Sequence, residues 1–267
     1  MASREEQKRR AREARLAEEQ RVAAAEQRRR RLMILGGVAL AAIVVVVVAI
    51  AISSSGGGGG GTNVSAGKPA SGGAAVQRLY AGIPQSNLVL GKSSAPVTLV
   101  EYIDLKCPVC QAFETRVFPS LLRDYVRRGR LRVEVRVQDF VGNEEHDSED
   151  AARMALAAGL QDRLYQFASL FYRHQGNENE AYVTDSFVTS IGKAVPGLDV
   201  NQALQQRSSS KVTRELQAAS SAFGSNGFTG TPSFQLGTTG GSLKPYQPHS
   251  YVDAAEFERA IDNLLGT

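Results

Sequence analysis

Two cysteines separated by two residues are the part of this chain best suited to chemistry. Cys107-Pro-Val-Cys110 follows an extended stretch at 97–103 that is rich in strand-forming residues, and it precedes apolar residues at helical spacing. Cys107 therefore lies where a strand gives way to a helix, whose first N–H groups and dipole stabilise negative charge. We expect a lowered pKa for its thiol. Pro108 suits a first helical turn, and Cys110, one turn on, can close a disulfide with Cys107.

The cysteine count restricts the chemistry further. The 267 residues include two cysteines, both in this motif, so the pair is redox-active, metal-binding or inert. Two thiolates at this spacing are half a zinc site, but no third cysteine and no H-x₃-H pair completes it. We expect His146, His174 and His249 to be surface or core residues. The expected redox group is the Cys107–Cys110 disulfide itself, with no metal and no cofactor.

The positive charge of the chain is concentrated in its first segment. The formal net charge is +4, but residues 1–31 carry a net +5 and the remainder a net −1. The rest of the chain therefore shows no signal for nucleic-acid binding. Residues 1–31 consist mostly of helix-forming residues with almost no large apolar side chains, which is typical of a solvated basic tail.

An apolar segment follows this tail. Residues 32–52 contain no charged side chain and are long enough to span a bilayer core. A cleaved signal peptide is disfavoured, because the preceding basic region and the apolar run are both too long. Arginines flank only the N-terminal side, which predicts a cytoplasmic tail and an exported remainder. Residues 53–76, with six consecutive glycines, are predicted to be a flexible linker to a domain at 77–267.

The first half of that domain has a strand–helix–strand pattern. After a short edge strand at 87–91 and the strand at 97–103, a helix is predicted over 107–128, kinked by Pro119 and ended by Gly129. Residues 131–137 alternate between apolar and charged side chains, which predicts a second strand with one polar face. A unit of this length implies a parallel pair of strands with a right-handed crossover.

Residues 145–224 are predicted to be a helical insertion, because they contain no strand-like run. We expect Ser148 to cap its first helix. After the insertion we predict strands at 233–236 and near 243–246, and a last helix capped by Asp253. This order of elements is that of an α/β thioredoxin-like fold, preceded here by one transmembrane helix. The predicted apolar faces of the insertion are Leu160, Leu164, Phe167 and Phe171, and Val212, Leu216, Ala219 and Phe223. Tyr165, Phe167, Phe171 and Tyr172 are expected in its core.

The chain resembles the DsbA-like branch of the thioredoxin superfamily, in the form that is anchored to the bacterial cytoplasmic membrane. The resemblance covers about residues 77–267. It rests on four segments, at 97–110 (VTLVEYIDLKCPVC), 118–140, 148–176 and 227–237 (GFTGTPSFQLG). A lone C-x-x-C is weak, but its placement between a strand and a helix, with Gly-Thr-Pro far downstream and before a strand, is specific.

The resemblance implies roles for three further residues. Pro232 would have a cis peptide bond and lie beside the cysteines, leaving the backbone of Thr231 to pair with an extended substrate. Glu101 matches the buried acid of the family, which would accept or relay a proton as Cys110 becomes a thiolate.

The residues beside the cysteines tune the expected chemistry. Strong oxidants of this family often carry histidine between the cysteines, whereas this chain has Val109. Valine adds no charge and no donor, so a less oxidising disulfide is expected. Asp104 and Lys106 are expected to be solvated loop residues, although the charge of Lys106 could favour the thiolate.

The predicted function is that of a membrane-tethered, extracytoplasmic thiol–disulfide oxidoreductase. Formation of disulfides in exported thiol-containing proteins is favoured over isomerisation, because no dimerisation segment is visible and a monomer is expected. The resemblance implies a quinone-linked membrane partner that reoxidises the pair. The alternatives are a disulfide isomerase, a reductase for a dedicated client, a thiolate metal-binding module and a scaffold with an inert disulfide.

Overall fold

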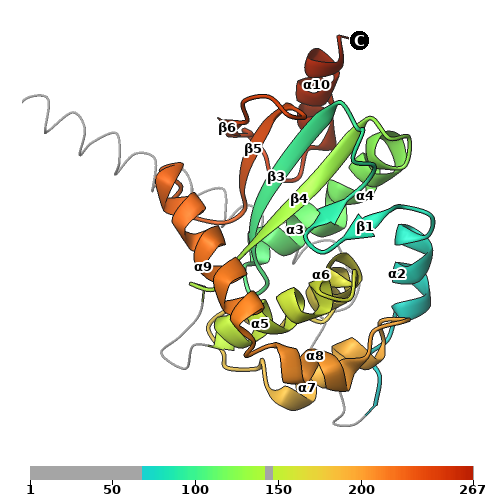
Figure 1. Ribbon diagram of the computed structural model, residues 1–267, viewed down its shortest axis with the longest axis vertical. Coiled ribbons are helices and arrows are strands. Elements are labelled where there is room, and N and C mark those ends of the chain that lie inside the picture. The colour runs from blue at the N-terminus through green and yellow to red at the C-terminus, as the bar shows by residue number, and fades with distance from the viewer. Residues whose placement is uncertain (1–67, 142–146, 267) are drawn as a thin grey trace, which may run out of the picture. The chain divides into compact units, whose positions relative to one another are not determined.

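The computed structural model describes residues 68–141 and 147–266 (Figure 1). The predicted basic tail, the predicted span at 32–52 and the linker up to residue 67 lie outside these residues. Within the described ranges, no helix is long and apolar enough to cross a membrane. Helix α2 (Gly73–Tyr80) begins inside the predicted linker, because Val76 and Tyr80 are buried in the core.

A six-stranded mixed sheet forms the centre of the described part, in the order β1-β2-β4-β3-β5-β6. Strands β3 and β4 are parallel, as predicted, and the other neighbouring pairs are antiparallel. The predicted edge strand is instead a small hairpin, whose turn includes Asn87 at a φ of 51°. The strands are β1 (Gln85–Ser86), β2 (Val89–Leu90), β3 (Val97–Asp104), β4 (Leu131–Gln138), β5 (Ser233–Thr238) and β6 (Lys244–Tyr246).

Strand β3, which leads to the cysteines, lies between β4 and β5 and is buried along its whole length. Neighbour β4 alternates between buried aliphatic residues and half-exposed Arg132, Glu134 and Arg136, so the predicted polar face is confirmed. In this register Glu101 is opposite Val135 on one side and Phe234 on the other. The sheet thus places an acid among apolar neighbours.

The helix after β3 is broken where a proline was predicted to kink it. Helix α3 (Pro108–Arg116) ends before Val117, and α4 (Phe118–Leu121) restarts with Pro119, which has no N–H to continue the ladder. A π-helical turn, η1 (Leu122–Val126), follows, in which the N–H of Arg127 bonds to the carbonyl of Leu122 five residues earlier. Gly129, with a φ of 72°, ends this unit as predicted, in a conformation that favours glycine.

An aromatic cluster fixes α3 against the rest of the domain. The ring of Phe113 lies 5.0 Å from that of Phe234 in β5 and 5.1 Å from that of Phe257 in α10 (Ala254–Leu265). All three residues are buried. Such ring pairs contribute beyond their buried area, so the helix that carries the cysteines is held from two sides. Asp253 caps α10 through the N–H of Ala255, as predicted.

The helical insertion gathers at one end of the sheet, away from α10 (Figure 1). Leu160 lies in the turn after α5, so the apolar face predicted from Leu160 to Phe171 is confirmed only from Leu164 onward. Tyr165, Phe167, Phe171 and Tyr172 are buried, as expected. The helices are α5 (Asp147–Gly159), α6 (Leu164–Arg173), α7 (Asp185–Lys193), α8 (Val200–Gln206) and α9 (Ser210–Ser225).

Candidate active site

The two cysteines begin helix α3, and they differ in their access to solvent. Cys107 is the N-cap residue, with an extended backbone, and Pro108 is the first helical residue, as predicted. The carbonyl of Cys107 accepts the N–H of Gln111 at 3.1 Å and so starts the helical ladder. The Cys107 residue is 6% exposed, whereas Cys110 is completely buried. Of the two cysteines, only Cys107 keeps any area exposed to solvent.

The two thiols also differ in acidity. A hydrogen bond with the Cys110 thiol is the largest influence that lowers the pKa of Cys107, and the N–H groups of Cys110 and Val109 add to it. The direction of the pKa shift agrees with the one predicted from the helix start, but its largest cause is the neighbouring thiol and the N–H groups contribute less. Burial, followed by the interaction with Cys107, raises the pKa of Cys110 well above its usual value. At neutral pH Cys107 is the thiol that ionises more readily.

The Gly-Thr-Pro segment lies against the first cysteine. The Thr231–Pro232 peptide bond is cis, as the resemblance implied. The Cys107 thiol donates a hydrogen bond to the Thr231 carbonyl at 3.2 Å. In the reduced protein this carbonyl accepts the thiol, and the expectation that the Thr231 backbone pairs with a substrate stays a prediction. The hydroxyl oxygen of Thr231 is buried and has no hydrogen-bond partner within the described residues.

Two acids lie in the interior behind the cysteines. Glu101 is buried, and burial, followed by repulsion from Glu114, raises its pKa well above the usual value. Glu114, one helical turn after Cys110, was not singled out from the sequence, although its spacing of four could have suggested it. It accepts a hydrogen bond from the Tyr80 hydroxyl at 2.9 Å. Its carboxyl is only partly accessible to solvent, and burial raises its pKa to about 8.

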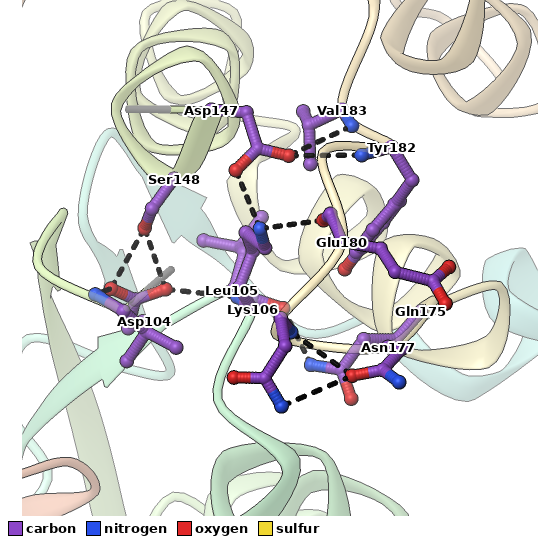
Figure 2. Close-up of polar contacts among 12 residues, drawn as sticks. Asp104, Leu105, Lys106, Asp147, Ser148, Gln175, Asn177, Glu180, Tyr182 and Val183 are labelled. Carbon is purple, nitrogen blue, oxygen red and sulfur yellow. Dashed lines mark hydrogen bonds and ion pairs between the residues drawn. The ribbon is translucent and has the colours of Figure 1, made fainter. Parts of the chain in front are cut away.

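Asp104 and Lys106, expected to be solvated, are both completely buried (Figure 2). Lys106 forms an ion pair with Asp147 at 2.5 Å. Ser148 lies inside α5 and donates its hydroxyl to the Asp104 carboxylate at 2.8 Å, so it does not cap the helix as predicted. These expectations are wrong because the insertion covers the turn before Cys107 and supplies polar partners there.

The described residues contain no group of three or more histidine, cysteine or acidic side chains arranged to hold a metal ion. His174 contacts the carbonyl of Ser71 at 2.9 Å, and His249 contacts Glu256 at 2.9 Å. Both histidines are thus engaged away from the cysteines. His146 lies outside the described residues.

Residues 85–263, more than half of the chain, match the family model described as thioredoxin. The chain belongs to the thioredoxin family. The match begins at the first residue of β1 and ends within α10, so it includes the whole sheet, the insertion and the cysteine pair.

Individual thioredoxin-family proteins are similar to this chain. The probable disulfide bond formation protein D of Bacillus anthracis is 30% identical over 129 residues, which are 48% of this chain and 59% of that protein. The chain thus spans less than two thirds of that curated relative. Oxidised BdbD from Bacillus subtilis has a TM-score of 0.58 at 20% identity, covering 69% of this chain and 98% of BdbD. A thioredoxin-like oxidoreductase from Silicibacter pomeroyi has a TM-score of 0.52 at 25% identity, covering 72% and 98%.

Replacing Val109 by histidine should make the disulfide of this thioredoxin-family site a stronger oxidant. Val109 already offers its N–H to Cys107, but its half-buried side chain has neither charge nor donor. A histidine would stabilise the thiolate and hence the reduced form. We expect a lower pKa for Cys107 and a reduction potential higher by a few tens of millivolts, since about 30 mV corresponds to roughly 1.4 kcal/mol.

Thiolate absorbance against pH measures the pKa of Cys107, and equilibration with glutathione measures the reduction potential. Val109→Leu is the matched control, because it changes the side chain without adding a donor. If the histidine variant matched the leucine variant in both measurements, position 109 would not tune the pair.

Proposed function

We propose that the protein is a thiol–disulfide oxidoreductase that forms disulfide bonds in exported proteins. The observation that carries the proposal is the inequality of the two thiols. Cys107 keeps a small exposed area and has a lowered pKa beside the Thr231 carbonyl, whereas Cys110 is completely buried and has a raised pKa. Such a pair has one entry point for a substrate and one internal resolving thiol. Two relatives from Bacillus species, each called a probable disulfide bond formation protein D, support the same direction of reaction.

The reaction begins with the oxidised pair. A substrate thiolate attacks the sulfur of Cys107, the Cys107–Cys110 bond breaks, and Cys110 leaves as a thiolate that takes up a proton. Cys107 is the sulfur attacked because Cys110 is completely buried. The product is a mixed disulfide between the substrate and Cys107.

A second substrate thiolate then attacks the substrate sulfur of the mixed disulfide. The substrate disulfide forms, and Cys107 leaves as a thiolate, so two electrons pass from the substrate to the cysteine pair. The lowered pKa of Cys107 makes it a good leaving group in this step. The low pKa thus favours release of an oxidised substrate.

The neighbouring groups have supporting roles in this scheme. A sulfur in a disulfide has no proton to donate, so oxidation of Cys107 releases the Thr231 carbonyl, which can then accept an N–H from an extended substrate. Glu101, whose pKa is raised well above its usual value by burial, is proposed to relay a proton to Cys110 as that sulfur leaves.

The reduction potential tests the direction of the reaction. The full-length protein in detergent is equilibrated with glutathione buffers, and the fraction of reduced Cys107–Cys110 is measured. An oxidase should have a potential above that of its compartment, and the oxidised protein should then form disulfides in a reduced, unfolded model protein. The alternative function is that of a reductase or isomerase for a dedicated client. Val109 favours it, because a valine at this position predicts a less oxidising disulfide, and a reduction potential below that of the compartment would support this alternative.

We also propose that the protein is held in the bacterial cytoplasmic membrane by residues 32–52, with its thioredoxin-like domain outside. The support is the uncharged length of this segment and the arginines on its N-terminal side. Protease added to intact spheroplasts should remove the domain and leave a protected fragment containing the basic tail. A domain that resists protease until the membrane is lysed would contradict this topology.

Repeated turnover requires that the reduced pair be oxidised again. We propose a quinone-linked membrane partner for this step, because an anchored domain remains near such a protein. The reduced full-length protein should then be oxidised by membranes to which a quinone is added. Oxidation at the same rate without membranes would argue against such a partner.

A further inference from the structure

A buried network of charges and amides joins the turn before the nucleophile to the helical insertion (Figure 2). Lys106 directly precedes Cys107, and its ammonium group donates to Asp147 at 2.5 Å and to the Glu180 carbonyl at 2.9 Å. The second carboxylate oxygen of Asp147 accepts the N–H groups of Tyr182 and Val183, each at 3.1 Å. Lys106 and Asp147 therefore both bind the backbone of the segment from Glu180 to Val183.

Gln175 begins that segment and holds the cysteine turn directly. Its side-chain amide donates to the carbonyl of Leu105 at 2.7 Å and to the carbonyl of Cys107 at 3.1 Å. We call residues 175–183 the strap. Gln175 is buried, so water does not compete freely for these two carbonyls. The strap thus contacts the backbone of the nucleophilic residue itself.

Asp104 fixes the other end of the same turn. Its carboxylate accepts the N–H of Lys106 at 2.9 Å and the N–H of Val141 at 2.9 Å, besides the Ser148 hydroxyl. The turn from Asp104 to Cys107 is therefore fixed at its start by α5 and at its end by the strap. A buried network whose members are satisfied specifies one geometry, because each lost bond leaves an unpaired polar group.

The charge of Lys106 is paired with Asp147 and is not among the main influences on the pKa of Cys107. Its ammonium group is directed to Asp147 and Glu180, whereas the pKa of Cys107 is lowered by the Cys110 thiol, by Thr231 and by the first N–H groups of α3. These hydrogen bonds depend on where the sulfur lies. A small displacement of the turn would weaken them and raise the pKa of Cys107.

We propose that Lys106, Asp147 and Gln175 are positioning residues that, through the strap, hold Cys107 at the start of α3. This proposal depends on the proposed function in one respect, which is that Cys107 is the nucleophile. The strap sets the acidity and reactivity of Cys107 from within the insertion, with no contact between these three side chains and a substrate.

The test measures the Cys107 thiol without any protein substrate. The reduced full-length protein in detergent is alkylated with iodoacetamide over a range of pH, which gives the pKa of Cys107, while urea unfolding gives the stability. Gln175→Leu should raise this pKa by about half a unit or more, a roughly threefold loss of thiolate near neutral pH. Gln161→Leu is the matched control, because Gln161 bonds to backbone groups of Asp199 elsewhere in the insertion.

A double variant separates positioning from stability. Lys106→Met alone leaves Asp147 buried without its cation and should destabilise the fold. Lys106→Met with Asp147→Leu removes both charges and should recover most of that stability, but it cannot restore the bonds to Glu180, Tyr182 and Val183. We expect the double variant to fold and to have a Cys107 pKa above that of the wild-type protein.

The double variant keeps the test decisive if Gln175→Leu does not fold. A wild-type pKa of Cys107 in either folded variant would overturn the proposal and leave the network a purely structural role. If instead the wild-type protein failed to oxidise thiols, the proposed function would fall while the comparison of pKa values would still stand.

Discussion

Replacing Cys110 by alanine should trap the protein in mixed disulfides with exported proteins, whereas replacing Cys107 by alanine should trap few or none. Cys107, the less buried of the two, forms the intermolecular bond, and the completely buried Cys110 is the group that would otherwise resolve it. Either substitution should abolish catalytic disulfide formation. The effect is expected to be nearly complete, because neither thiol has a substitute in a chain with two cysteines.

Trapped species are detected by quenching cells with acid, blocking free thiols and comparing gels run with and without reductant. The doubly substituted protein, which has no thiol, is the control for non-covalent association. Equal trapping by the two single variants would contradict the assignment of Cys107 as the nucleophile.

Replacing Asp104 by asparagine should remove a pH-dependent loss of stability. Burial raises the pKa of Asp104 to about 6, despite hydrogen bonds from Val141, Lys106 and Ser148. The folded protein then binds more protons than the unfolded chain between about pH 4 and 6, so stability falls as the pH rises through this range and the loss is complete above pH 6. The contribution of Asp104 between pH 4.5 and 8 is about 2 kcal/mol.

Urea unfolding of both proteins at several pH values measures this difference. Asparagine resembles the protonated carboxyl, so the stability of Asp104→Asn relative to wild type should increase by about that amount from pH 4.5 to 8. Asp253→Asn is the control, because asparagine caps a helix about as well as aspartate. Parallel stability curves for Asp104→Asn and wild type would show that Asp104 does not titrate in this range.

The sequence predicted the features that local rules determine. Backbone preferences explain the break at Pro119 and the end of the helical unit at Gly129. Side-chain type and periodicity explain the strand before Cys107 and the alternation of β4. The placement of Cys107 at the N-cap and the direction of its pKa shift follow from the same local pattern. The catalytic roles of Thr231, Pro232 and Glu101 stay predictions.

The surroundings of Lys106 could not be predicted in the same way. A charged residue in a loop is usually solvated, and the partners that bury this lysine lie 41 and 74 residues further along the chain. Ser148 was misread because its position before a helical pattern suits a cap, whereas its partner is a carboxylate 44 residues away. Periodicity identifies which face of a helix is apolar, but it gives no information on which distant groups meet.

The bond between the Cys107 thiol and the Thr231 carbonyl joins residues 124 positions apart, which has a consequence for biosynthesis. A ribosome delivers the cysteine motif first, then the insertion that covers its turn, and the Gly-Thr-Pro segment and β5 near the end. Until β5 arrives, the central strand β3 lacks one neighbour and the nucleophile lacks its carbonyl partner. The newly made chain therefore carries its cysteine pair before the carbonyl partner of the nucleophile exists, and the site is complete only when the last quarter of the domain has been synthesised.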